Sequence, residues 1–134
     1  MKDLAALEAL TETLLVTDSG FAPVDGAEVL DLPSDADAET LTEALHTNAT
    51  IRIDFPSFAD GRGFTLARRL RQMGFAGHLR AKGHVLADQY AMARRSGFDD
   101  VEIDAALAAR QPEDQWLSRA NWRDHDHRSR LQGA

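Results

Sequence analysis

Apolar and polar residues alternate along the chain with the two-residue period of β-strands at several places. The clearest stretch is TIRIDF at 50–55, which ends at Pro56, a residue without the N–H needed to continue a sheet ladder. Apolar runs of strand length bounded by turn residues also occur at 11–18, 26–32, 78–83 and 98–103. We predict a strand at each of these positions.

Segments with helical periodicity separate these strands. The 35–47 segment has acidic residues in its first turn and an apolar stripe of Leu41, Ala44 and Leu45. Further helices are predicted at 64–73, at 84–97, from 104 onward and over 113–120. The residues expected on the buried faces of the helices at 64–73 and 84–97 are Leu66, Ala67, Leu70, Met73, Val85, Leu86, Met92 and Ala93. Gly97 is well placed to end the second of these helices.

The order of elements predicts an α/β fold. Strands that alternate with helices of ten to fourteen residues favour an open parallel or mixed sheet of about four or five strands with flanking helices, partly barrel-like. The link between 11–18 and 26–32 is too short for a crossover helix, so these strands form either a hairpin or an irregular excursion. We expect one α/β domain at 1–112, followed by a C-terminal helix and polar tail at 113–134.

The composition excludes several classes of function. The 134-residue chain contains no cysteine, which excludes disulfides, thiolate metal sites and thiol catalysis. It has no apolar run long enough to cross a bilayer and no signal-peptide pattern at its start, so we expect a cytoplasmic protein without membrane contact. No cofactor-binding or metal-binding motif is evident, and we predict neither a cofactor nor a metal.

The formal net charge of −7 argues against a nucleic-acid partner but hides a strong asymmetry. Residues 1–60 contain 13 acids and two bases, whereas residues 61–95 contain eight bases and one acid. One interpretation is that arginines occupy solvated helix faces beside an acidic N-terminal part. The other is an electropositive face that binds an anion or an acidic protein.

The best candidate site is the loop Asp60-Gly61-Arg62-Gly63, which follows the strand at 50–55 and precedes a helix. Ligands of parallel α/β folds bind at this end of the strands, where glycines allow close approach and helix amides are free. The guanidinium of Arg62 suits a carboxylate, a phosphate or a sulfur oxyanion. The structural alternative is that Asp60 and Arg62 form a pair that stabilises the turn.

Other residues could support such an anion- or partner-binding site. Arg80 and Lys82 lie on the next strand, and His84 lies at its junction with the following helix. Asp88 and Gln89 come one turn later and could line the same rim. For His84, Asp88 and Gln89 the structural alternative is a solvated surface position.

Two features of the C-terminal region invite functional interpretations. Trp116 and Trp122 could anchor a docked partner, since tryptophan is enriched at interface hot spots, or they could pack on their own domain. The run from Asp124 to His127 alternates acid and histidine, residue types that bind metals, but a polar tail offers no second shell to hold such ligands, so we assign no metal there. No complete set of nucleophile, base and oxyanion donors is evident, and whether the protein is an enzyme stays open.

The stretch from 53 to 103 resembles bacterial domain-of-unknown-function family 934, whose members are usually encoded beside assimilatory sulfite reductase. The residues that carry the resemblance are Asp54-Phe55-Pro56, Phe58, Asp60-Gly61-Arg62-Gly63, Leu79-Arg80-Ala81, Gly83, Val85-Leu86, Asp88-Gln89, Arg95 and Gly97-Phe98-Asp99. One departure is His84, which stands where the family pattern has an acid, so His84 is a poor choice for a shared catalytic residue.

The resemblance implies a role in sulfate assimilation and sulfite reduction. The function that we expect is a non-catalytic accessory protein that binds sulfite reductase or its electron donor. The alternative is a small anion-binding enzyme, or a regulatory domain for a metabolite, that uses the loop from Asp60 to Gly63.

Overall fold

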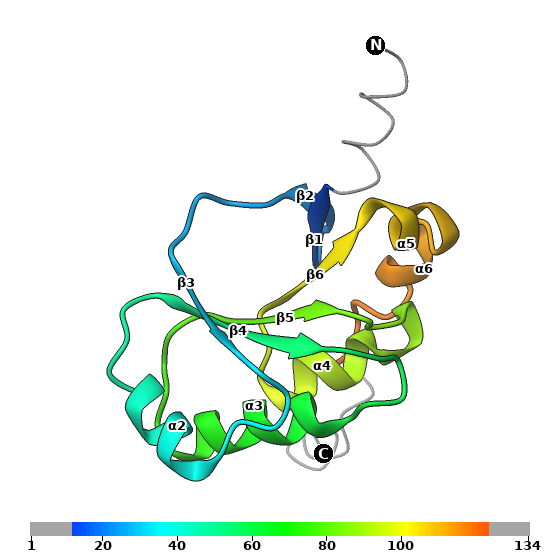
Figure 1. Ribbon diagram of the computed structural model, residues 1–134. Coiled ribbons are helices and arrows are strands. Elements are labelled where there is room, and N and C mark those ends of the chain that lie inside the picture. Colours follow the sequence, from blue (N-terminus) through cyan, green and yellow to red (C-terminus); the bar gives the residue numbers. More distant parts are fainter. Residues whose placement is uncertain (1–11, 124–134) are drawn as a thin grey trace.

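The computed structural model describes residues 12–123, which form a six-stranded sheet with helices packed against it (Figure 1). The strands are β1 (Thr13–Thr17), β2 (Gly20–Pro23), β3 (Val29–Leu32), β4 (Thr50–Phe55), β5 (Leu79–Gly83) and β6 (Asp100–Asp104). The helices are α2 (Ala38–Ala44), α3 (Arg62–Gln72), α4 (Tyr90–Ser96), α5 (Ala105–Arg110) and α6 (Glu113–Leu117), with a 3-10 turn, η1, at Ala87–Gln89. The fold is therefore the mixed α/β class that the sequence predicts, and the sheet does not close into a barrel.

The sheet has the strand order β2-β1-β6-β5-β4-β3. Strands β3 to β6 are parallel neighbours in chain order, whereas β1 pairs antiparallel with both β6 and β2. Successive right-handed crossovers that step in one direction place their helices on one side of a sheet. Helices α2, α3 and α4 lie together on that side in Figure 1, so the other side of the parallel strands carries no helix of the described chain.

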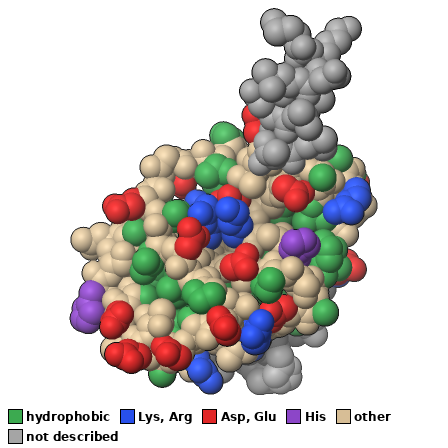
Figure 2. Space-filling model, viewed as in Figure 1, with side chains coloured by type: hydrophobic (Ala, Val, Ile, Leu, Met, Phe, Trp, Pro, Cys, Tyr) green, Lys and Arg blue, Asp and Glu red, His purple; other side chains and the backbone are tan. Residues whose placement is uncertain are grey.

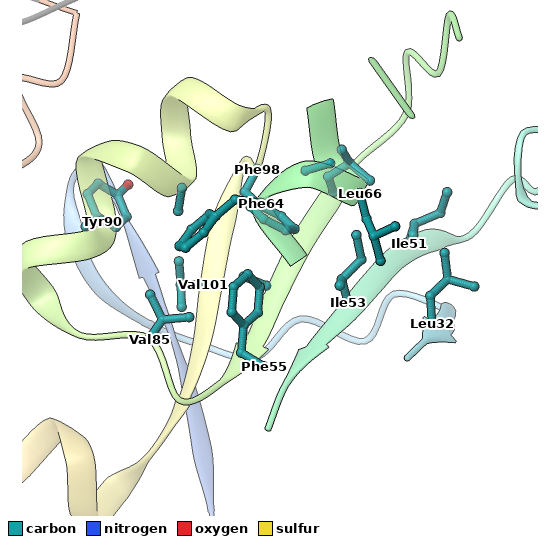
Figure 3. Close-up of a cluster of buried hydrophobic side chains, with 14 of the residues drawn as sticks. Leu32, Ile51, Ile53, Phe55, Phe64, Leu66, Val85, Tyr90, Phe98 and Val101 are labelled. Atoms are coloured by element: carbon teal, nitrogen blue, oxygen red, sulfur yellow. The ribbon is translucent and has the colours of Figure 1, made fainter. Parts of the chain in front are cut away.

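The hydrophobic core lies between the sheet and this helical layer. Ile51, Ile53 and Phe55 alternate along β4 toward the helices, and all three are buried. Figure 3 shows Phe55 pointing toward Phe64 of α3, and the two rings meet edge-on with centroids 4.9 Å apart. Phe98 packs on the same ring at 5.8 Å. Edge-to-face aromatic packing of this kind joins β4 to the helices that cover it.

The opposite face of the sheet, which we call the open face, carries charged residues at the alternate positions. Figure 2 shows Lys and Arg side chains near the centre of this face, over β4 and β5, with carboxylates around them. Arg52 bridges Asp31 and Glu102, with its Nη1 3.1 Å from Glu102 Oε1. Arg80, fully buried, donates to Asp100 and to Asp25 of the 24–28 connection, which crosses this face between β2 and β3. Charge pairing therefore replaces a second apolar layer.

The pairing of the predicted strands at 11–18 and 26–32 differs from a simple hairpin between the two. The strand predicted at 11–18 does form a hairpin, but its partner is β2, which was not predicted, and not the strand at 26–32. Strand β3 lies at the far edge of the sheet, next to β4, so the irregular excursion is the correct alternative. Strand β2 was not predicted because its four residues, GFAP, begin with a glycine and end with a proline, which are typical of turns. Its exposed edge is covered by Glu113, whose carboxylate accepts the Phe21 N–H at 2.7 Å.

Two helix-face assignments were also wrong. Met73 and Met92 are 40% and 46% exposed, although both were expected in the core. The 84–97 segment is not one continuous helix, because the 3-10 turn η1 precedes α4 and rotates the face that points inward, so Tyr90 is buried instead of Met92. Gly97 ends α4 with φ +118°, which confirms its predicted role.

We expect Arg80→Leu to lower the free energy of unfolding by about 3–5 kcal/mol, because it leaves the buried Asp100 without its main countercharge. Denaturant unfolding followed by tryptophan fluorescence measures this loss. The exposed Arg110, replaced in the same way, is the control and should change stability by no more than about 0.5 kcal/mol. A loss below about 1 kcal/mol for Arg80→Leu would contradict the role assigned to the buried pair.

Candidate functional site

The 60–63 segment lies at the junction of β4 and α3, as predicted, but α3 begins at Arg62, two residues earlier than expected. The two charged residues of this segment pair with each other. Asp60 Oδ1 accepts the backbone N–H of Arg62 at 3.0 Å, and Asp60 Oδ2 lies 2.7 Å from Arg62 Nη2. The side-chain hydrogen bonds from Arg62, followed by the one from its backbone, hold the pKa of Asp60 well below its ordinary value. The geometry is that of the turn-stabilising pair, and an anion at this loop would compete with the Asp60 carboxylate for the Arg62 donors.

The two loop glycines have different roles. Gly61 has φ −91° and only Phe64 within 4 Å of a Cβ built on it, at 3.9 Å, so its backbone does not require glycine. Gly63 is buried, and a Cβ there would lie 2.5 Å from Cζ of Phe55. The need for glycine at 63 therefore comes from the close packing of α3 on β4 rather than from a ligand.

His84 and Gln89 lie close to the segment that precedes this loop. The ring of His84 places Nδ1 3.1 Å from the Phe55 carbonyl oxygen and meets Phe58 edge-on with centroids 5.0 Å apart. Gln89 donates from Nε2 to the Phe58 carbonyl and accepts the Leu86 N–H on Oε1. The contacts of His84 and Gln89 thus hold the 55–58 segment against the start of η1.

The remaining predicted rim residues lie elsewhere. Asp88 is exposed and pairs with Arg119, whose Nη2 is 3.0 Å from its Oδ1. Arg80 and Lys82 project from the open face of β5, on the other side of the sheet from α3. Burial alone would lower the pKa of Arg80, but its hydrogen bonds to Asp100 and Asp25 outweigh burial and raise that pKa. The structure therefore does not bring Arg80, Lys82 and Asp88 together with Arg62.

The two tryptophans have different environments. Trp116 is 1% exposed, packs edge-on against Tyr90 and donates its indole N–H to the Gln111 carbonyl oxygen at 2.9 Å. Its predicted place on a docking surface is wrong, because this side chain belongs to the core. Trp122 is only half-buried, and the guanidinium of Arg94 lies 4.7 Å from the centroid of its ring.

Trp122 forms one wall of a pocket of about 440 Å³ between α3 and α4. We call this feature the arginine pocket; its lining residues are Arg68, Arg71, Gln72, Arg95, Ser96, Gly97 and Trp122. Arg71 is held by the fold, because it donates to the carbonyl oxygens of Phe75, Gly77 and Gly97 and pairs with Asp99. Arg68 and Arg95 are exposed. Arg95 donates from Nε to the Trp122 carbonyl oxygen at 3.3 Å, and its two terminal nitrogens have no hydrogen-bond partner among residues 12–123.

The arginine pocket contains most of the positive charge that the fold leaves uncompensated in the basic stretch. Within residues 12–123, carboxylates pair with Arg62, Arg71, Arg80 and Arg94, and Glu102 lies 3.9 Å from Lys82. No carboxylate of these described residues lies within 4.0 Å of Arg68, Arg69 or Arg95. Of the basic residues that could form the electropositive face suggested by the sequence, only these three arginines of α3 and α4 have no carboxylate near them in the described part of the chain. Helical spacing on the exposed sides of the two helices was the signal that could have singled them out.

The match to a family model covers most of the chain. A model described as "Bacterial protein of unknown function (DUF934)" matches residues 29–127. The chain belongs to this family. Neither the comparison with curated proteins nor the comparison with solved structures gave a match. The matched range includes the 60–63 loop and the arginine pocket.

The predictions that the protein binds no metal and does not span a membrane concern features outside this site. Within residues 12–123, no group of three or more His, Cys, Asp or Glu side chains is placed to hold a metal ion. The run from Asp124 to His127 lies outside the described residues. None of the described helices has the length and apolar character needed to cross a membrane.

We expect Gly63→Ala to destabilise the protein by about 1–3 kcal/mol, because the added methyl overlaps the Phe55 ring. Gly61→Ala is the matched control in the same loop and should stay within about 0.5 kcal/mol of the wild type. Thermal and denaturant unfolding of both variants measure the difference. Equal stability of the two variants would show that the packing on Phe55 does not impose glycine at 63.

Proposed function

We propose that this protein is a non-catalytic accessory protein of assimilatory sulfite reduction that docks on the reductase or its electron donor. The pathway rests on the resemblance described above. The mode of action rests on the arginine pocket. One observation carries the proposal: Arg68 and Arg95 meet at a pocket beside a half-buried tryptophan, and neither has a carboxylate partner among the described residues.

Uncompensated arginines of this kind suit a protein partner with an acidic surface. Exposed charges accelerate the encounter of two proteins whose surfaces are complementary, and arginine and tryptophan dominate the energetics of many interfaces. The orientation of the Trp122 side chain is already fixed by its own domain. Its indole N–H donates to Asp18 Oδ2 at 3.3 Å, and the Arg94 guanidinium packs over its ring. A prefixed aromatic wall loses little conformational entropy when a partner binds.

The 60–63 loop supports the alternative function less well. Its only arginine faces Asp60, and its first helix amide is occupied by the same carboxylate. Arg68, Arg69 and Arg95 have no such competitor among residues 12–123. The geometry therefore favours docking through the arginine pocket over binding of a small anion at the loop.

We expect the purified protein to bind sulfite reductase or its electron donor at low ionic strength, and this binding to weaken at high salt. Charge reversal in the Arg68→Glu/Arg95→Glu variant should reduce the affinity at least about tenfold, a change of about 1.4 kcal/mol. Biolayer interferometry at about 50 and 500 mM salt measures both effects, since screening lengths differ severalfold between these conditions.

Arg110→Glu is the matched control, because Arg110 is an exposed arginine on α5, outside the arginine pocket. This variant should bind like the wild type. Absence of any complex with either protein at low salt would refute the docking proposal, as would equal affinities for the double variant and the control.

The pathway assignment is tested by deletion of the gene. We expect the deletion strain to grow on sulfide or cysteine but poorly on sulfate or sulfite as sulfur source. Plasmid copies of the wild type and of Arg110→Glu should restore growth, whereas the Arg68→Glu/Arg95→Glu copy should not. Normal growth of the deletion strain on sulfate would remove the protein from this pathway.

A further inference from the structure

The open face of the sheet contains a second pocket, which the docking proposal does not use. This pocket of about 400 Å³ is lined by Asp31, Leu32, Pro33, Asp54 and Lys82. It lies where β3, β4 and β5 end, and ligands of open parallel sheets bind at these carboxyl ends. We propose that this pocket, named here the Lys82 pocket, binds a small zwitterion with the charge pattern of a free amino acid.

The Lys82 pocket offers one donor group and one acceptor group that have no hydrogen-bond partner among residues 12–123. Lys82 and Asp54 are direct neighbours on β5 and β4, yet no salt bridge joins them within 4.0 Å. In the described part of the chain, the carboxylate nearest to the Lys82 ammonium is that of Glu102, whose Oε2 is 3.9 Å away, beyond hydrogen-bond distance. Among the described residues, neither the Lys82 ammonium nor the Asp54 carboxylate has a hydrogen-bond partner.

Neighbouring charges keep these two groups available. Glu102 already accepts hydrogen bonds from Thr13 at 2.9 Å and from Arg52 at 3.1 Å. Asp31 is paired with the same Arg52, yet its side chain remains 62% exposed at the pocket. Because Arg52 satisfies Glu102 and Asp31, Lys82 is not drawn fully onto either carboxylate, and its side chain stays 41% exposed.

The charges on the pocket wall decide the class of ligand. A simple anion held by Lys82 would also face the carboxylates of Asp31 and Asp54, which repel it. A zwitterion can place its carboxylate on Lys82 and its ammonium between Asp54 and Asp31. Its aliphatic part would then contact the exposed Pro33, because the Leu32 side chain is buried in the core on the other side of β3. Lys82 does not form an oxyanion site together with Arg62, because Arg62 lies on the other side of the sheet.

The test is a titration of the full-length, isotope-labelled protein with each of the twenty L-amino acids, followed by amide and side-chain NMR shifts. We expect saturable shifts around Lys82 and Asp54 with at least one amino acid. Its N-acetyl derivative, which lacks the cation, and its decarboxylated amine, which lacks the anion, should each bind at least about tenfold more weakly. Sulfite and phosphate, titrated in parallel, should give no saturable shift at this pocket.

The isosteric or near-isosteric variants Lys82→Gln and Asp54→Asn should each weaken the binding of that amino acid at least about tenfold. Asp114→Asn on α6 is the matched control and should leave it unchanged, because Asp114 is an exposed carboxylate outside the pocket. Three results would overturn the proposal: no saturable binding of any amino acid, equal binding to Lys82→Gln and wild type, or preference for sulfite or phosphate. The arginine pocket lies on the helical layer, so none of these results bears on docking.

Discussion

All crossover helices between the parallel strands lie on one face of the sheet, and this one-sided arrangement determines how the rest of the molecule is built. The strands β3 to β6 follow one another in space as they do in the chain, and right-handed crossovers then stack α2, α3 and α4 on the same side. Each strand needs apolar residues on that side only. The alternate positions face the open side, where polar residues can be hydrated or paired.

The open face shows how the chain stabilises a sheet without a second helical layer. Arg80 is completely buried there, and such a charge persists only where carboxylates surround it. Asp100 comes from the neighbouring strand, whereas Asp25 comes from the connection that carries the chain from one edge of the sheet to the other. The same ion pair therefore neutralises the buried arginine and fixes the path of the 24–28 connection.

The ion pairs also decide which cations remain for function. A basic stretch that looks uniform in sequence is divided by the fold into arginines that pair with a carboxylate and arginines that have none among the described residues. Arg71 fastens the end of α4 to the end of α3 through Gly97 and Phe75, and Arg94 bonds to Asp18 after β1. Only Arg68, Arg69 and Arg95 on α3 and α4 are left without a carboxylate in the described part of the chain. The proposed docking function is assigned to arginines that the fold does not need as partners for its own carboxylates.

The sequence by itself determined the α/β class, the position of β4 and the stripes of Leu41 and Leu70, because periodicity reflects which side of an element is buried. It also located the 60–63 loop at a strand-to-helix junction. It left open whether Asp60 pairs with Arg62 and whether Trp116 packs on its own domain, and it did not reveal that Arg80 and Lys82 face away from α3. These facts depend on contacts between residues distant in the chain and on which side of a strand faces the helices. Local pattern gives the alternation along a strand, but only the assembled sheet decides what each side meets.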